Sequence, residues 1–325
     1  MTSLYPFTFK PQPKPRIWGG NKLRMLFNKP FPETEKIGES WEVSAVQRNL
    51  SVVTNGFLKG NTIEELIEVY LGELVGDRIY ERYGVELPIL VKLIDAAETL
   101  SVQVHPDDAT ALERHNAYGK TEMWYVLQAD RGAGLYVGFN RNLSPTELYE
   151  RVQQSTLIDA LNFVAVQPGD MFFIAPGTIH AIGQGIVLAE IQQTSDITYR
   201  VYDWGREHNP ATARDMHLDL AIDVIDYTQK TTAKTLYERQ PNTPVSLVRS
   251  PYFTTSLLEV DRPLARNLAD NDSFVIYVCL DGCATIRYPS GDEMLPKGQT
   301  LLVPAAIADI TIIPQPAARL LETSL

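Results

Sequence analysis

Short runs rich in valine, isoleucine, tyrosine and phenylalanine, separated by turn residues, make up most of this chain of 325 residues. Such runs predict β-strands, and they do not alternate with helices in the regular rhythm that a parallel sheet requires. We therefore expect a mainly β fold. The length suggests two domains, with one large domain as the alternative.

Two segments have the periodicity of helices. In residues 62–83, Thr62 and Glu65 match a capping box, and apolar residues recur at helical spacing after them. A second helix is predicted for residues 144–161, with Ser144 as its N-cap. Both helices are expected to be scaffold and not part of a functional site.

A polar segment with two prolines, residues 229–246, marks the predicted domain boundary. It divides the chain into a domain of residues 1–235 and a domain of residues 240–325. Beyond the boundary, residues 296–306 echo residues 167–177, which suggests a weak internal repeat of one β-unit.

Residues 274–288 predict a β-hairpin in which Asp281 and Gly282 form a two-residue turn. Cys279 and Cys283 flank this turn, and their spacing is neither that of a redox pair nor that of a zinc knuckle. We expect both cysteines to be reduced packing residues.

The formal net charge of −11 argues against a nucleic-acid partner, because binding to a phosphate backbone needs clustered lysine and arginine. No stretch approaches the roughly 20 apolar residues of a membrane span. The first seven residues lack the basic and apolar regions of a signal peptide, so a cytoplasmic location without a membrane partner is expected.

Four side chains that can bind a divalent metal fall in three short segments. Ser101, Gln103 and His105 alternate along one predicted strand, so their side chains should project from the same face. Glu122 opens a second strand candidate that could run beside the first. His180 follows a turn and would come from a third strand.

Two imidazoles and a carboxylate, with an amide oxygen and one open position, suit Zn²⁺ or another borderline divalent ion. Taken singly, each histidine is better explained as a hydrogen-bonded structural residue and the glutamate as a solvated charge, but the set together favours a metal site. His115, His208 and His217 have no such partners at ligand spacing and are interpreted as surface or structural residues.

Arg200 lies in a strand-like run in which alternate residues, up to Arg206, could share one face. If that face looks inward, the guanidinium needs an anionic partner such as a bound phosphate or an enediolate. An ion pair with Asp196 or Asp203 is the alternative. Lys120, two residues before Glu122, could contact a ligand in a pocket or could be an exposed loop lysine.

Seven ordered segments resemble the type I mannose-6-phosphate isomerases of the shorter bacterial kind, which are zinc enzymes with a cupin fold. The segments span residues 16–23, 37–44, 87–95, 100–106, 119–125, 176–181 and 199–203. The resemblance implies a cupin domain (a double-stranded β-helix, or jelly roll) that binds metal and has helical insertions. A second, metal-free cupin domain would follow at the C-terminal end.

The resemblance also implies roles for residues of the site. One Zn²⁺ per chain would be bound by His105, Glu122 and His180, with Gln103 as an optional fourth ligand. Arg200 matches the active-site arginine of the family. Ser101 and Lys120 match residues that contact the phosphorylated sugar.

The reaction implied is the reversible interconversion of mannose 6-phosphate and fructose 6-phosphate through an enediol. A base must move the proton, and Glu190 is the first candidate because its strand leads to Arg200, with Lys120 second. The alternative for Glu190 is an outward-facing strand carboxylate. A non-catalytic sugar-binding or regulatory cupin, and more remotely a metal-dependent oxygenase, are the competing functions. The oligomeric state stays open.

Overall fold

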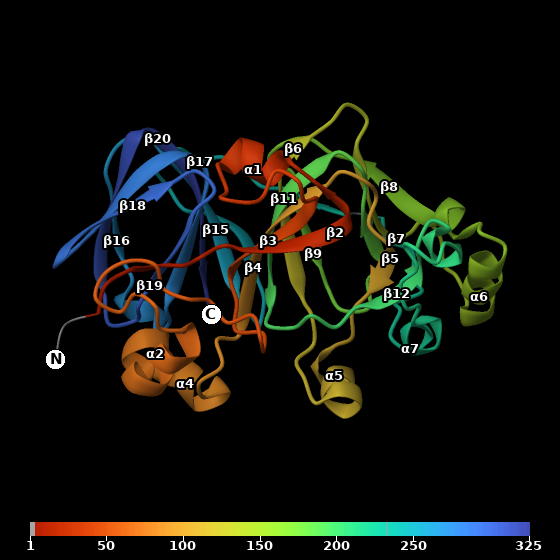
Figure 1. Ribbon diagram of the computed structural model, residues 1–325, viewed down its shortest axis with the longest axis horizontal. Helices are drawn as coiled ribbons and strands as arrows, with labels where there is room; N and C mark the ends of the chain where they lie inside the picture. The colour runs from red at the N-terminus through yellow and green to blue at the C-terminus, as the bar shows by residue number, and fades with distance from the viewer. Residues whose placement is uncertain (1–3, 232) are drawn as a thin grey trace.

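The computed structural model describes residues 4–231 and 233–325, and its strands form three sheets (Figure 1). The middle sheet has seven strands, in the order β13 (Lys234–Thr235), β9 (Met171–Ile174), β6 (Glu122–Ala129), β11 (Ile186–Gln193), β4 (Ile89–Ala96), β3 (Ile37–Val43) and β2 (Gln12–Gly20). The prediction of a mainly β chain is confirmed.

A five-stranded sheet has the order β12 (Tyr199–Tyr202), β5 (Val102–Val104), β10 (His180–Ile182), β7 (Gly134–Phe139) and β8 (Leu161–Ala165). The third sheet follows the path β1 (Phe7–Thr8), β19 (Thr300–Val303), β17 (Val275–Tyr288), β20 (Asp309–Ser324), β15 (Thr254–Val260) and β14 (Val245–Arg249). Two more strands pair off this path, β16 (Leu264–Asn267) with β20 and β18 (Gly291–Pro296) with β17.

The middle sheet is covered on both faces. On its inner face, Trp124 and Leu188 pack with Leu135 and Ile182 of the five-stranded sheet. On its outer face, residues such as Met123 join a core that includes apolar side chains of the C-terminal sheet. Because both faces are covered, β4 and β11 are buried along their whole length, as their nearly continuous apolar sequences require.

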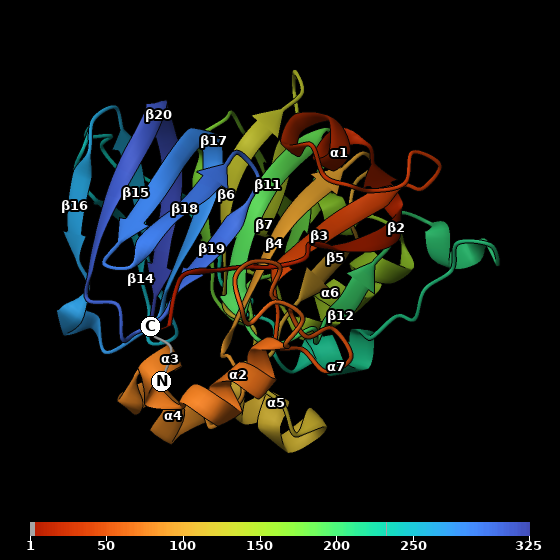
Figure 2. The ribbon, with the colours of Figure 1, turned by 60° about the vertical axis from the view of Figure 1, so that its left-hand side comes forward.

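Helices lie at the margins of the sheets. They are α1 (Lys22–Phe27), α2 (Ile63–Tyr70), α3 (Gly72–Val75), α4 (Asp77–Tyr83), α5 (Asp108–His115), α6 (Pro145–Gln153) and α7 (Leu218–Ile222). Short 3₁₀ turns occur at Leu157–Ala160, Arg206–His208 and Ala269–Asn271. Helices α2 to α5 gather at one end of the sheets (Figure 2). No helix among the described residues is long and apolar enough to cross a membrane.

The helix predicted for residues 62–83 forms in three pieces. Its capping box is confirmed, since Thr62 and Glu65 cap each other reciprocally. The chain then breaks at Leu71 and Gly76, which have positive φ angles of 50° and 98°. At the second break, the amide of Phe274 donates to the carbonyl of Val75, so pairing with the C-terminal unit replaces bonds of a continuous helix.

The second predicted helix is shorter than expected. Ser144 is its N-cap, as predicted, and its hydroxyl accepts a hydrogen bond from the amide of Glu147. The α-helix ends at Gln153, and Ser155 adopts a positive φ of 56° before the 3₁₀ turn. The expected end at residue 161 is therefore wrong.

The hairpin predicted at Asp281 and Gly282 is also wrong. Strand β17 runs straight through this dipeptide and pairs with β20 on both sides of it. The register shifts around Gly282, whose φ is 72°, so the dipeptide forms an irregularity within the strand and not a turn. Cys279 is a free, buried thiol in the core of this unit, as expected of a packing residue, and Cys283 is a free thiol that is partly exposed.

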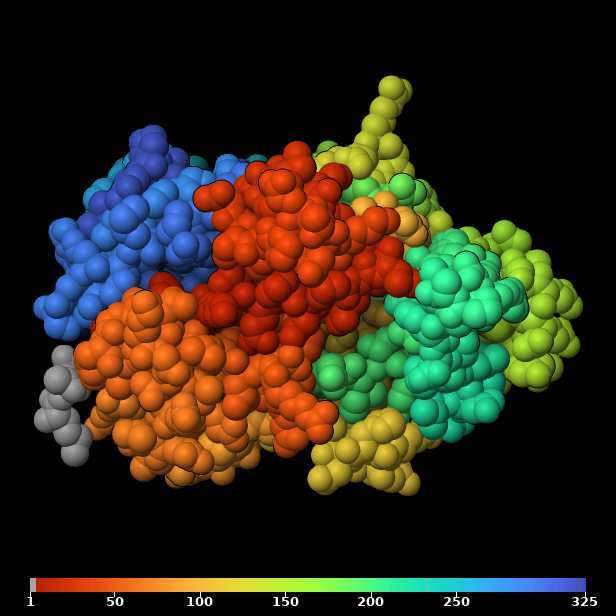
Figure 3. Space-filling model, in the orientation of Figure 1, coloured from red at the N-terminus to blue at the C-terminus, as the bar shows by residue number. Residues whose placement is uncertain are grey.

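The segment between β13 and β14 contains the predicted domain boundary. Strand β1, from the start of the chain, pairs with β19 in the C-terminal sheet. Figure 3 shows the N-terminal segment lying across the junction of the two units. The exact division at residues 235 and 240 stays a prediction.

Both copies of the suggested repeat are turns with a left-handed glycine, Gly169 or Gly298, followed by a strand.

The break at Gly76 should be sensitive to a single added methyl group. A Cβ at this position would lie 2.1 Å from the carbonyl oxygen of Asp272, whereas a Cβ at Gly60, which has the same φ of 98°, would meet nothing within 4 Å. We expect Gly76→Ala to lower the free energy of unfolding by about 2 kcal/mol more than Gly60→Ala does. Chemical denaturation of both variants measures this difference, and equal losses would show that the contact with Asp272 is unimportant.

Candidate active site

Three segments far apart in the sequence meet in the space between the middle sheet and the five-stranded sheet. His105 follows β5 directly and His180 begins β10, and these strands are neighbours in the five-stranded sheet. Glu122 begins β6 in the middle sheet. The expectation that the strand of Glu122 runs beside that of His105 is therefore wrong, because the chain crosses to the other sheet between them.

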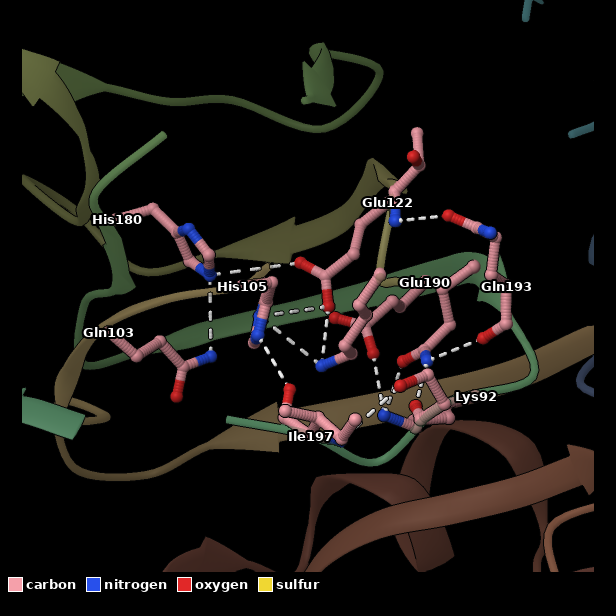
Figure 4. Close-up of polar contacts among 12 residues, drawn as sticks. Lys92, Gln103, His105, Glu122, His180, Glu190, Gln193 and Ile197 are labelled. Carbon is pink, nitrogen blue, oxygen red and sulfur yellow. Dashed lines mark hydrogen bonds and ion pairs between the residues drawn. The ribbon is translucent and has the colours of Figure 1, made fainter. Parts of the chain in front are cut away.

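The three side chains form a compact and buried cluster (Figure 4). Their candidate ligand atoms all lie within 4.8 Å of one another. His105 Nε2 is 3.4 Å from Glu122 Oε1, and His180 Nε2 is 3.7 Å from Glu122 Oε2. None of the three residues is more than 1% exposed. The structure thus brings together the three residues predicted to bind the metal.

Backbone carbonyls orient both imidazoles. His105 Nδ1 lies 2.9 Å from the carbonyl oxygen of Ile197, and His180 Nδ1 lies 2.8 Å from that of Thr178. Each Nδ1–H donates to its carbonyl, so each Nε2 presents a lone pair toward Glu122. Burial lowers the pKa of both histidines, and with the nearby Lys120 ammonium it brings that of His105 to about 3. Neutral imidazoles are the form that binds a metal.

Glu122 is a buried carboxylate whose surroundings fit a cation. Neither of its oxygens accepts a well-directed hydrogen bond among the described residues, which would be costly in the absence of a positive partner. Burial alone would raise its pKa, but Lys120 and the imidazoles hold that pKa well below its usual range. Lys120 Nζ, 2.7 Å from Glu122 Oε1 and 3.3 Å from His105 Nε2, shows that the cluster attracts positive charge.

Gln103 lies at the edge of the cluster. Its cross-strand partner in β10 is His180, and its Nε2 is 3.3 Å from His180 Nε2. The oxygen and nitrogen of an amide are assigned from the surrounding hydrogen bonds, and turning this amide would direct its oxygen to the same place. The side chain is thus placed to supply an oxygen, and its role as a fourth ligand stays a prediction.

A cavity of about 390 Å³ adjoins the cluster. Its lining includes Ser101, Gln103, Lys120, Glu190 and Arg200. These five are all of the predicted site residues apart from the three clustered ligands. A cleft of this size with several convergent polar groups is typical of a small-molecule site.

Glu190 faces inward from β11 and is only 3% exposed, so its interpretation as an outward strand carboxylate is wrong. Lys92 Nζ donates to its Oε1 over 2.8 Å, and Trp124 Nε1 donates to its Oε2 over 2.8 Å. Burial, together with the negative charge of Glu122, raises the pKa of Glu190 despite the lysine.

Arg200 forms neither of the ion pairs considered from the sequence. Asp203 is instead paired with Arg206, at 2.8 Å, and with Arg214, at 2.5 Å. Arg200 donates to the hydroxyl of Ser101 and to a backbone carbonyl, and no ion pair with a carboxylate is found for it in residues 4–231 and 233–325. Burial, and after it the charge of Arg214, lowers the pKa of Arg200.

The predicted alternation from Arg200 to Arg206 is not kept. The register shifts directly after Arg200, and Arg206 lies in a 3₁₀ turn beyond the end of β12. Of the alternating residues Arg200, Tyr202, Trp204 and Arg206, only Arg200 lines the cavity.

Four further lining residues, Glu39, Trp41, Lys92 and Arg214, were not predicted from the sequence. Lys92 could have been recognised from the sequence as a candidate site residue, because it is a single lysine within the apolar run of β4. The remaining histidines are structural or exposed, as predicted: His115 contacts the hydroxyl of Tyr199, His217 accepts from the amide of Arg200, and the side chain of His208 is 81% exposed.

Comparison with known proteins agrees with this geometry. Residues 7–127 match the family model of the type I phosphomannose isomerase catalytic domain, and residues 244–315 match that of the mannose-6-phosphate isomerase cupin domain. A mannose-6-phosphate isomerase from Streptococcus mutans is 36% identical over 93% of both chains. The chain belongs to the type I phosphomannose isomerase family. Mannose-6-phosphate isomerase ManA from Bacillus subtilis is 34% identical over 94% of this chain and 95% of its own.

Solved structures lead to the same family. The mannose 6-phosphate isomerase of Bacillus subtilis superposes with a TM-score of 0.87 at 30% identity and covers 99% of this chain and 100% of its own. The predicted cupin fold and the prediction of an isomerase are confirmed, and catalysis is favoured over a non-catalytic binding role. The family and the buried cluster also indicate a metal cofactor.

The ligand cluster makes a direct prediction about metal content. We expect His105→Ala to reduce the bound divalent metal from about one equivalent to nearly none, because two of the three clustered ligands cannot hold the ion against chelation. His208→Ala, which changes an exposed histidine, is the matched control. Elemental analysis of both purified variants measures the ratio of metal to protein, and full metal retention by His105→Ala would contradict the ligand assignment.

Proposed function

We propose that this protein interconverts mannose 6-phosphate and fructose 6-phosphate with one Zn²⁺ per chain, held by His105, Glu122 and His180 and by Gln103 as a fourth ligand. The observation that supports this most is the position of the neutral imidazoles and the unsatisfied carboxylate beside a cavity that contains Lys120. When bound, zinc would supply Lewis-acid polarisation of the carbonyl and hydroxyl oxygens of the sugar. A cytoplasmic location stays a prediction from the sequence.

The cavity suits an anionic substrate although the chain carries a net charge of −11. Four cationic side chains line it in addition to Lys92, namely Arg16, Lys120, Arg200 and Arg214. Arg200 has no carboxylate partner within the described part of the chain, so its charge is available to the substrate. Ser101, which accepts a hydrogen bond from Arg200, and Lys120 are the proposed substrate contacts.

Strand register sets the order of groups along the cavity. Arg200 on β12 lies opposite Gln103 on β5, which in turn lies opposite His180 on β10. Neighbouring strands are about 4.8 Å apart, so the backbone of Arg200 is roughly 10 Å from that of His180. Arg200 can therefore extend toward a sugar bound at the cluster and stabilise negative charge as the enediol forms.

Glu190 is the proposed base that carries the proton between C2 and C1. A carboxylate with a raised pKa is a better proton acceptor than an ordinary surface glutamate. Lys92 and Trp124 each hold one of its oxygens, which fixes the plane of the carboxylate in the cavity. Lys120 is the second candidate, although its ammonium group is engaged with Glu122.

Removal of the metal by a chelator should show whether the protein is an enzyme or a non-catalytic binding protein. We expect purified protein to turn over mannose 6-phosphate in a coupled assay, to lose activity when zinc is removed, and to regain it when zinc is restored. These changes follow because the sugar oxygens would lose the charge that stabilises the enediol. Full zinc occupancy without turnover would instead support a non-catalytic sugar-binding cupin.

Replacing the proposed base should affect chemistry more than binding. We expect Glu190→Gln to lower kcat by about 10² to 10⁴-fold, because an amide of the same shape cannot accept the proton. Zinc content and KM should change little. Glu68→Gln, on the exposed face of α2, is the control for the substitution itself. A kcat within a few-fold of the unsubstituted protein would shift the assignment to Lys120.

A further inference from the structure

A hydrogen-bonded pair outside the cavity holds the segment that connects Lys120 to Glu122. Thr121 lies between these two residues and is 1% exposed. Its amide donates to Gln193 Oε1 over 2.9 Å, and its carbonyl accepts from the amide of Gln193 over 3.2 Å. Gln193 thus satisfies both backbone groups of the residue that separates the proposed substrate contact from the proposed metal ligand.

Asp108, at the start of α5, completes the arrangement. Its Oδ1 accepts from Gln193 Nε2 over 2.9 Å and from the amide of Gly119 over 2.9 Å. The same segment is also tied to the chain that follows His105, since the amide of Lys120 donates to the carbonyl of Pro106 over 3.1 Å. The backbone from residue 119 to 121 is therefore held on both sides.

The end of a strand ladder explains why a side chain is needed here. The register of β11 with β6 ends at the pair of Gln192 with Glu122. Beyond that pair, the amide oxygen of Gln193 takes the place that a strand carbonyl would occupy. Figure 4 shows Gln193 beside the backbone that leads into Glu122. Without it, the buried amide of Thr121 would lose its partner.

We propose that Gln193 and Asp108 are a positioning pair that sets where Glu122 meets the metal and where Lys120 meets the substrate. Neither residue lines the 390 Å³ cavity, so both act through residues 119–122. The inference rests on the proposed function for the roles of Lys120 and Glu122. Because Lys120 Nζ and Glu122 Oε1 are 2.7 Å apart, a shift of this backbone moves both groups together. A displacement of about 1 Å near a reacting centre can cost roughly 10²-fold in rate.

Reversing the polarity of the pair provides the test. Gln193→Glu places a carboxylate against Asp108, so the two acceptors repel and the contact opens. We expect zinc affinity, measured on apoprotein by chelator competition, to fall at least about tenfold, and kcat/KM to fall by about 10²-fold. Asp108→Asn alone keeps an oxygen for Gly119 and Gln193 and should have little effect. The double variant restores a donor opposite the new acceptor but turns the amide oxygen of residue 108 away from the Gly119 amide, so it should recover both quantities in part and exceed Gln193→Glu in each.

Gln128→Glu is the control for the substitution itself, because Gln128 lies at the far end of β6 and contacts Asp130 and Lys22, away from residues 119–122. It should leave zinc affinity and kcat/KM unchanged. Asp108→Ala, which removes the shared acceptor without adding charge, gives a second disruption if Gln193→Glu does not fold, and it should also weaken zinc binding.

Two results would overturn the proposal. One is unchanged zinc affinity in folded Gln193→Glu or Asp108→Ala. The other is a folded double variant that recovers thermal stability but neither zinc affinity nor kcat/KM, since that outcome indicates a purely structural contact. Zinc affinity of the apoprotein does not depend on turnover, so a failure of the isomerase assignment would be recognised separately.

Discussion

A single buried carboxylate determines much of the structure around the site. Glu122 lies buried at the start of a strand, and its carboxylate accepts no well-directed hydrogen bond from the residues that the structure describes. A carboxylate in such a place is costly unless positive charge surrounds it. The imidazoles, each turned by a backbone carbonyl, and the ammonium of Lys120 meet this demand. The need for positive charge around Glu122 therefore explains both the local arrangement of these side chains and the suitability of the cluster for a metal ion.

The layered sheets make this arrangement stable. The middle sheet carries charged residues such as Lys92 and Glu190 on its inner face, and its outer face packs on the C-terminal sheet. A buried lysine joins the units: Lys29 Nζ donates to Glu42 over 2.7 Å within the N-terminal unit and to the carbonyl of Gly298 in the C-terminal unit over 2.6 Å. The C-terminal unit thus covers the outer face of the middle sheet with apolar side chains, while the inner face holds polar groups.

Local rules predicted the parts of the structure that depend on neighbours in sequence. Alternation placed Ser101 and Gln103 on the cavity side of one strand, and the capping box at Thr62 was found in place. Features decided by distant pairing were missed. The sheet to which Glu122 belongs depends on a chain crossing, and the passage of β17 through Gly282 depends on continued pairing with β20. Gly76 likewise takes its conformation from contact with the C-terminal unit.

The two glutamates of the cavity illustrate how environment assigns different roles to the same side chain. Both are buried, and burial alone would raise the pKa of each. Glu122 has two imidazoles and the ammonium of Lys120 as close neighbours, and its lowered pKa fits its proposed role as a metal ligand. The negative charge of Glu122 adds to the effect of burial and keeps the pKa of Glu190 raised despite Lys92, which fits its proposed role as the base. Opposite pKa shifts of two carboxyl groups in one pocket are typical of enzymes in which one group stays charged and the other transfers a proton.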